Sequence, residues 1–147
     1  MKNNTTKAET GKKLIKKGEE RLKESEKITS KAKNILDENI RKVKKYKTRI
    51  EEGEMIKDES ANLLEKGDIL IEKRENNSQM KEIGKKNIIM GKRLKRAGET
   101  RVKNYQGEKE KSEEWIEHGK ELMEKGEKIE EIGEELIKTG KRLKSKC

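Results

Sequence analysis

The sequence contains no proline and no phenylalanine, and it has one cysteine, one tryptophan and one histidine. Without proline, no residue type is present that removes a backbone donor from a helix interior. A single cysteine, Cys147, excludes an internal disulfide framework. One histidine, His118, and one cysteine leave a zinc site within one chain short of ligands. We therefore expect no bound metal, no cofactor and no disulfide scaffold.

Long apolar runs are also missing. The longest uncharged run within the apolar regions is 87–91, far short of the roughly 20 residues that a membrane-spanning helix needs. The first ten residues hold no apolar segment of the kind found in secretory signals. The glycines show neither the spacing nor the flanking residues of a phosphate-binding loop. We expect a cytoplasmic protein that is not an enzyme and that has no small-molecule substrate.

Charge dominates what is present. Charged residues make up 48% of the 147 residues, and the formal net charge is +10. Leu, Ile, Val and Phe are scarce enough that composition alone would suggest disorder. The apolar residues are periodic, however, and a thin helical structure needs a stripe of them rather than a thick core. We therefore predict an all-α protein.

The clearest pattern is a seven-residue repeat near the C-terminus. Gly119, Gly126, Gly133 and Gly140 are seven apart, and Leu, Ile or Met follows each of them after three or four residues. At about 100° per residue, these offsets fall within one arc of a helix, with the glycine near its middle. The pattern predicts an amphipathic helix whose apolar stripe has a notch along its centre.

The same repeat covers most of the chain, and we call its positions the frame sites. The first half has Gly11, Gly18, Ser25, Ala32, Asn39, Tyr46, Gly53, Ser60 and Gly67 at these sites. The second half has Gly84, Gly91, Gly98, Tyr105, Ser112, Gly119, Gly126, Gly133 and Gly140. The spacing breaks between the two halves, where 74–79 is the most turn-like stretch of the chain.

These features predict a long antiparallel helical hairpin that resembles a coiled coil with glycine at heptad positions. We expect a disordered tail over 1–5 and a single helical domain over 6–147. Within it we expect a helix over 6–74, which starts at the capping-box pattern of Thr6 to Glu9, a hinge over 75–79 and a helix over 80–146. The alternative is a four-helix bundle, with further breaks at Gly107 and around 34–39.

A glycine inside a helix costs about 1 kcal/mol relative to alanine, so the repeat needs a compensating gain. Close helix packing at the notch would supply it, whereas a flexible face that wraps a membrane or filament is the alternative. The predicted interface glycines are Gly11, Gly18, Gly53, Gly67, Gly84, Gly91, Gly98, Gly119, Gly126, Gly133 and Gly140. We expect a structural or scaffolding protein that self-associates through this stripe, as a homo-oligomer or with a helical protein partner.

Charge predicts how the halves align. With the hinge near residue 77, residue i should face residue 154 − i. Residues 81–103 then carry nine basic and two acidic side chains opposite 51–73, which carries eight acidic and three basic ones. The stretch 61–71, opposite 83–93, is also the most apolar part, and we expect the closest helix packing there. Tyr46 and Tyr105 should lie near each other, and Trp115, three residues after a frame site, should lie in the interface.

At the other end of the hairpin, basic residues from both termini should converge. These candidate anion-binding residues are Lys12, Lys13, Lys16, Lys17, Lys138, Lys141, Arg142, Lys144 and Lys146. Like charges held together are destabilising unless an anion is bound. The alternative function is therefore a basic helical protein that binds a polyanion, such as the phosphates of DNA or RNA, or an anionic membrane surface.

Overall fold

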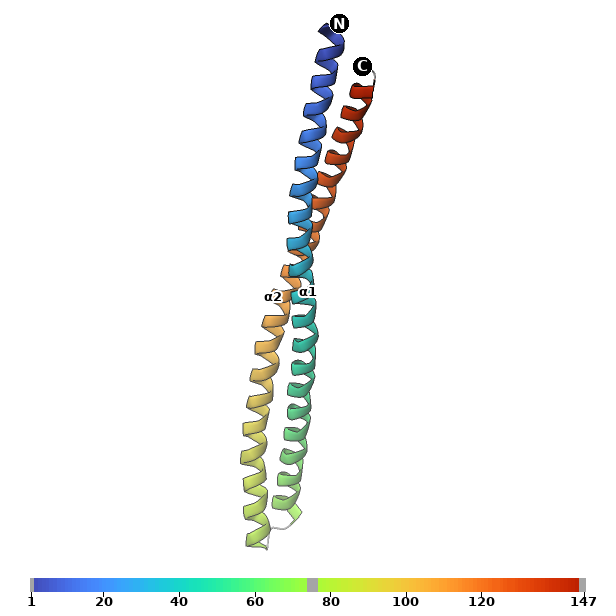
Figure 1. Cartoon of the computed structure of the whole chain (residues 1–147). Coiled ribbons are helices and arrows are strands. Elements are labelled where there is room, and N and C mark those ends of the chain that lie inside the picture. The colour runs from blue at the N-terminus through green and yellow to red at the C-terminus, as the bar shows by residue number, and fades with distance from the viewer. Residues whose placement is uncertain (1, 74–76, 146–147) are drawn as a thin grey trace. The chain divides into compact units, whose positions relative to one another are not determined.

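The computed structural model describes residues 2–73 and 77–145, with side chains from residue 6 onward. Among these residues there are two helices, α1 (Lys2–Lys73) and α2 (Ser78–Ser145), and no strand (Figure 1). The helices pack against each other in opposite directions, which confirms the predicted all-α helical hairpin. The four-helix bundle is not found, because Gly107 and the stretch 34–39 both lie inside a helix.

The first helix starts earlier than predicted. α1 begins at Lys2, so the backbone of residues 2–5 is helical rather than a disordered tail. Nothing in these residues forbids a helix, since they include neither proline nor glycine, and the helix extends past the predicted cap at Thr6. Residue 1, the remainder of the predicted tail, lies outside the described residues.

The second helix starts at a side-chain cap. The Oδ1 atom of Asn77 accepts hydrogen bonds from the backbone N–H groups of Gln79, at 3.1 Å, and Met80, at 3.2 Å. Asn77 thus satisfies two donors that have no partner within the first turn of α2. Of the predicted hinge 75–79, residues 75 and 76 lie outside the described residues, and 78 and 79 already belong to α2. Residue 146, the predicted end of that helix, is also outside them.

Backbone contacts divide the chain into two compact units. Unit 1 consists of Met1–Ile40 with Glu114–Cys147, and unit 2 consists of Arg41–Glu113. Each unit therefore pairs one part of α1 with one part of α2. We had expected a single helical domain over 6–147, and the division into two units is a feature that the sequence did not suggest.

The core of each unit is the line of frame sites. Every buried residue of the described chain occupies a frame site, and the Leu, Ile and Val side chains three or four residues after these sites are half-buried. Ala32 is the buried hydrophobic residue, whereas Ser25, Asn39, Ser60 and Ser112 are buried polar ones. The deepest part of the hairpin thus contains its smallest side chains.

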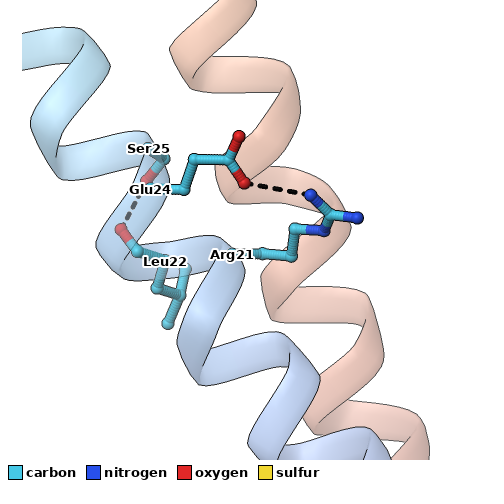
Figure 2. Close-up of polar contacts among 4 residues, drawn as sticks. All are labelled: Arg21, Leu22, Glu24 and Ser25. Atoms are coloured by element: carbon cyan, nitrogen blue, oxygen red, sulfur yellow. Dashed lines mark hydrogen bonds and ion pairs between the residues drawn. The ribbon is translucent and has the colours of Figure 1, made fainter.

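The buried polar side chains bond to their own helix. The Ser25 hydroxyl donates to the carbonyl oxygen of Leu22 at 2.8 Å, as Figure 2 shows, and Ser60 donates to Lys57 at 2.6 Å. The Asn39 amide donates to the carbonyl oxygen of Ile35 at 2.8 Å. Among the described residues, no buried side-chain nitrogen or oxygen lacks a partner. Small polar residues can therefore occupy frame sites without leaving a donor unsatisfied.

Candidate interaction surfaces

In unit 1, the frame glycines bring the two backbones into contact. A Cβ atom built on Gly11 would lie 2.6 Å from the carbonyl oxygen of Gly140, and one on Gly140 would lie 2.6 Å from that of Gly11. Gly18 and Gly133 face each other in the same way, with corresponding distances of 2.6 and 2.9 Å. No real Cβ could occupy these positions unless the helices moved apart. Glycine is therefore required by the close approach.

In unit 2, the glycines also face the opposite helix, at somewhat longer distances. A Cβ on Gly67 or on Gly84 would lie 2.8 Å from the carbonyl oxygen of the other. For Gly53 and Gly98 the corresponding distances are 3.3 and 2.9 Å. The shortest glycine–glycine approach is thus in unit 1. The sequence predicts the closest packing at 61–71 against 83–93, but the Gly67–Gly84 pair there is slightly further apart than Gly11 and Gly140 and about as close as Gly18 and Gly133.

The remaining predicted interface glycines also contact the opposite helix. A Cβ on Gly91 would lie 2.9 Å from Leu64, one on Gly119 would lie 3.0 Å from Leu36, and one on Gly126 would lie 2.5 Å from Thr29. Gly107, which is off the frame, has nothing within 4 Å. The notched stripe of each helix is therefore occupied by the other helix of the same chain.

The facing residues correct the predicted alignment. Their numbers sum to 151 rather than 154, as seen for Gly11 with Gly140, Gly18 with Gly133, Tyr46 with Tyr105, Gly53 with Gly98, Ser60 with Gly91, and Gly67 with Gly84. The difference of three residues places frame site opposite frame site. An alignment at 154 would instead put each frame glycine opposite a residue three positions from the partner frame site, where the bulky side chains lie.

Two aromatic predictions have different outcomes. The rings of Tyr46 and Tyr105 lie together, with centroids 5.9 Å apart and planes tilted by 31°. They are the two half-buried frame residues of the described chain. Trp115, in contrast, is 53% exposed and packs edge-on against His118, with the ring centroids 5.5 Å apart. Its predicted place in the interface is wrong, because a position three residues after a frame site lies at the rim of the stripe, where a long side chain can extend outward.

The candidate anion-binding residues lie on α1 and α2 of unit 1. The contact between Gly11 and Gly140 brings the two basic segments to the same end of that unit. Every one of them that is described has an exposed side chain, and Lys146 lies outside the described residues. At the corrected alignment, however, Lys16 and Lys17 are level with Glu135 and Glu134. The positive charge is therefore concentrated beyond these two carboxylates, toward the termini.

The ion pairs described for this chain each lie within a single helix. Those that we describe connect residues three or four apart in one helix, such as Arg21 with Glu24 at 2.9 Å (Figure 2) and Arg49 with Glu52 at 3.2 Å. Four more have the same spacing. Exposed pairs of this kind are worth about 0.5 kcal/mol or less. The helix contact therefore rests on the frame sites and their apolar flanks.

The surface also carries features that the sequence analysis did not identify. Large hydrophobic side chains are exposed at Ile40, Met55, Ile69, Ile83, Ile89, Met90, Trp115 and Ile132. An open hollow of about 560 Å³ lies on α2 in unit 2, and its lining residues are Arg96, Ala97, Thr100, Arg101, Asn104, Tyr105 and Glu108. The seven-residue spacing of several uncharged exposed residues was the signal that could have revealed this surface.

The chain matches no protein-family model, and no curated protein or solved structure is significantly similar to it. Neither α1 nor α2, over the residues described, contains a segment apolar enough and long enough to cross a bilayer. The described residues contain no group of three or more histidine, cysteine or carboxylate side chains placed to hold a metal ion.

Proposed function

We propose that this chain is a cytoplasmic, non-catalytic helical scaffold whose hairpin associates with further copies of itself. The observation that carries the proposal is the set of exposed large hydrophobic residues on a chain that is 48% charged. Because the notched stripe is occupied within the chain, copies in this hairpin form associate through the exposed residues rather than through the glycines. Five of these eight residues, Met55, Ile69, Ile83, Ile89 and Met90, belong to unit 2, and a group of exposed apolar side chains is typical of a protein interaction site.

The use of buried polar groups supports a structural role. Ser25, Asn39 and Ser60 hydrogen-bond the carbonyl groups of their own helix, which closes the helix contact and orients no group toward a substrate. The hollow on α2 is open, and its lining combines two arginines and Glu108 with Tyr105 and the smaller side chains of Ala97, Thr100 and Asn104. Such a lining suits a side chain of another protein surface better than an enclosed small molecule.

Sedimentation equilibrium or light scattering of the full chain, at increasing protein concentration and under reducing conditions, tests the proposal. We expect a dimer or a larger assembly whose mass rises with concentration. A Cys147→Ser variant should give the same masses, because the association is non-covalent. A chain that stays monomeric up to the highest soluble concentration would contradict the proposed function.

The basic end of unit 1 favours a second candidate function, the binding of a polyanion. The Gly11–Gly140 contact places exposed lysines of both helices side by side, and Lys141, Arg142 and Lys144 lie beyond the carboxylates of Glu134 and Glu135. Such a cluster would contact phosphates without reading a sequence, and binding would weaken steeply with salt. The phosphates could belong to nucleic acid or to the headgroups of an anionic membrane.

Fluorescence anisotropy with duplex and single-stranded DNA, together with flotation on vesicles that contain anionic lipid, separates these two sources. Replacing the five C-terminal cations (Lys138, Lys141, Arg142, Lys144 and Lys146) by glutamine should weaken binding and reduce its salt dependence. A matched variant with five glutamines at exposed lysines of unit 2 should change binding much less. Equal losses in both variants would indicate general charge attraction and remove the basic end as a site.

A further inference from the structure

Unit 2 carries two rows of uncharged residues on its exterior. The row on α1 consists of Thr48, Met55, Asn62 and Ile69, and the row on α2 consists of Ile83, Met90, Ala97 and Asn104. Members of each row are seven residues apart, and all of them are exposed, including Met55 at 63% and Met90 at 56%. Eight uncharged positions at regular spacing are unexpected on the outside of a chain that is 48% charged.

Both rows lie on the same half of the helix pair, although they point in different directions. The α1 row is two residues after the frame sites and the α2 row is one residue before them. At about 100° per residue, they lie about 160° and 100° from the frame sites, in the same rotational sense. The α1 row is therefore near the outer edge of the pair, and the α2 row is on the flank. The corrected alignment places Ile69 level with Ile83, and Met55 level with Ala97.

The charges around the two rows have opposite signs. Met55 is surrounded, at three and four residues in each direction, by the carboxylates of Glu51, Glu52, Asp58 and Glu59. On α2, Ala97 lies in the open hollow of about 560 Å³, whose lining includes the guanidinium groups of Arg96 and Arg101. The α1 row thus offers a long apolar side chain ringed by acids. The α2 row borders a hollow whose lining includes the small side chain of Ala97, two guanidinium groups and one carboxylate, Glu108.

We propose that this face of unit 2, the docking face, binds the docking face of a second copy of the chain. Each α1 row packs on the α2 row of the other copy, and the side chain of Met55 enters the hollow over Ala97. This proposal rests on the proposed function, since it names the surface through which copies associate. The contact is self-complementary, and it occurs twice across a two-fold axis parallel to the helices.

Charge selects this arrangement over the other symmetric one. Two copies of the same face can be stacked with a two-fold axis either along the helices or across them. An axis across the helices would place α1 on α1, so that segment 51–73, with eight acidic residues, would meet itself. An axis along the helices places 51–73 on 81–103, which carries nine basic residues. Opposite charges across an interface favour encounter and suppress the wrong pairing.

The docking face does not continue on α1 of unit 1. The positions that extend the α1 row there are Lys13, Glu20, Lys27 and Asn34, three of which are charged. On α2, the extension contains His118, Lys125, Ile132 and Thr139. Ile132 is about as exposed as Met90, at 53% against 56%. The part of α1 level with Ile132, however, carries no uncharged row. Ile132 therefore provides a control residue at the equivalent position of the seven-residue repeat in α2.

Two charge variants and their mixture test the docking face. Met55→Lys should place a cation against Arg96 and Arg101, and Ala97→Glu should place a carboxylate against the acids around Met55. Each variant alone should weaken association by about tenfold or more. A mixture of the two should form a mixed dimer, because one contact is then wild type and the other pairs lysine with glutamate. Ile132→Glu should associate as the wild type does, and circular dichroism should show unchanged helix content in all three.

Cross-linking provides a second measurement that does not depend on affinity. In chains that carry Cys147→Ser, Ile69→Cys chains mixed with Ile83→Cys chains should form disulfide-linked mixed dimers under mild oxidation. Ile69→Cys chains mixed with Lys16→Cys chains should form few. If both charge variants associate like Ile132→Glu, or if the two mixtures cross-link equally, the docking face is wrong while self-association stands. A monomeric wild-type chain would overturn the docking face together with the proposed function.

Discussion

The two units share the same seven-residue frame but differ in the residues that occupy it and in their exposed surfaces. Unit 1 has the closest glycine pair, Gly11 with Gly140, and unit 2 has the most widely separated one, Gly53 with Gly98. Unit 2 also has a tyrosine pair at one frame level and an exposed uncharged row on each helix. Different residues thus form the helix contact and the exposed surface, because the frame sites point toward the opposite helix and the uncharged rows point outward.

The frame residues explain the difference in backbone separation. Where glycine faces glycine, a carbonyl oxygen of the opposite helix and a flanking side chain, such as Ile137 at Gly18 or Ile88 at Gly67, take the place of the missing side chain. Where serine faces glycine, as at Ser60 and Gly91, the Cβ position of the glycine is closest to Leu64, and the carbonyl oxygen of Ser60 is 3.2 Å away. The tyrosine rings at Tyr46 and Tyr105 fill a frame level in unit 2 with side chains. The identity of the frame pair is therefore one factor in the local helix distance.

The largest expected effect comes from filling the notch in each unit in turn. Gly18→Leu with Gly133→Leu should destabilise unit 1 by about 4 kcal/mol, because each leucine meets backbone that has to move. Gly53→Leu with Gly98→Leu should destabilise unit 2 by about 2 kcal/mol, since the helices start further apart. Hydrogen exchange measured by mass spectrometry would assign each loss to its unit. Equal losses would show that the backbone distances do not distinguish the units.

The tyrosine pair gives the next largest effect, and it should be confined to unit 2. Tyr105→Ala should cost about 2 kcal/mol, because it leaves a space at a level where the helices cannot close. A double-mutant cycle with Tyr46→Ala should show a coupling of about 1 kcal/mol between the rings. Denaturant unfolding measures both quantities. Additive losses would mean that the rings pack on the flanking residues rather than on each other.

Removing the cap of α2 should have a smaller effect. Asn77→Ala leaves the N–H groups of Gln79 and Met80 without their side-chain acceptor and should cost about 1 kcal/mol. Asn77→Asp keeps the acceptor and should retain stability. Denaturant unfolding of the two variants gives the comparison, and a loss of equal size in Asn77→Asp would show that the cap is not the cause.

The smallest expected effect has the opposite sign. Gly107→Ala should stabilise unit 2 by up to about 1 kcal/mol, because a Cβ there meets nothing within 4 Å and alanine favours the helix. Gly18→Ala is the matched comparison, and it should destabilise unit 1 although its helix propensity changes equally. Thermal unfolding of both variants checks the sign. Stabilisation by both would show that the helices adjust to a methyl group at the notch.

Much of the fold could be predicted from the sequence. The absence of proline, the frame from Gly11 to Gly140 and the break between Gly67 and Gly84 together predict two long antiparallel helices. The contact of frame glycines with the opposite helix also follows from the sequence, because ten or more helix-destabilising residues need a common compensation. The exposed position of Trp115 was not predictable, since offset three places a residue at the rim, and only its packing shows to which side it turns.

What the sequence by itself determined is the periodicity, and with it the helices, their apolar stripes and the reversal of direction near the middle. A seven-residue period cannot determine the alignment of two stripes, because sliding one helix by a few residues leaves both patterns intact. The tertiary structure decided whether the numbers of facing residues sum to 154 or to 151. It did so because two backbones approach most closely where glycine faces glycine, as at Gly67 and Gly84, and only that alignment also leaves room for the flanking leucines and isoleucines.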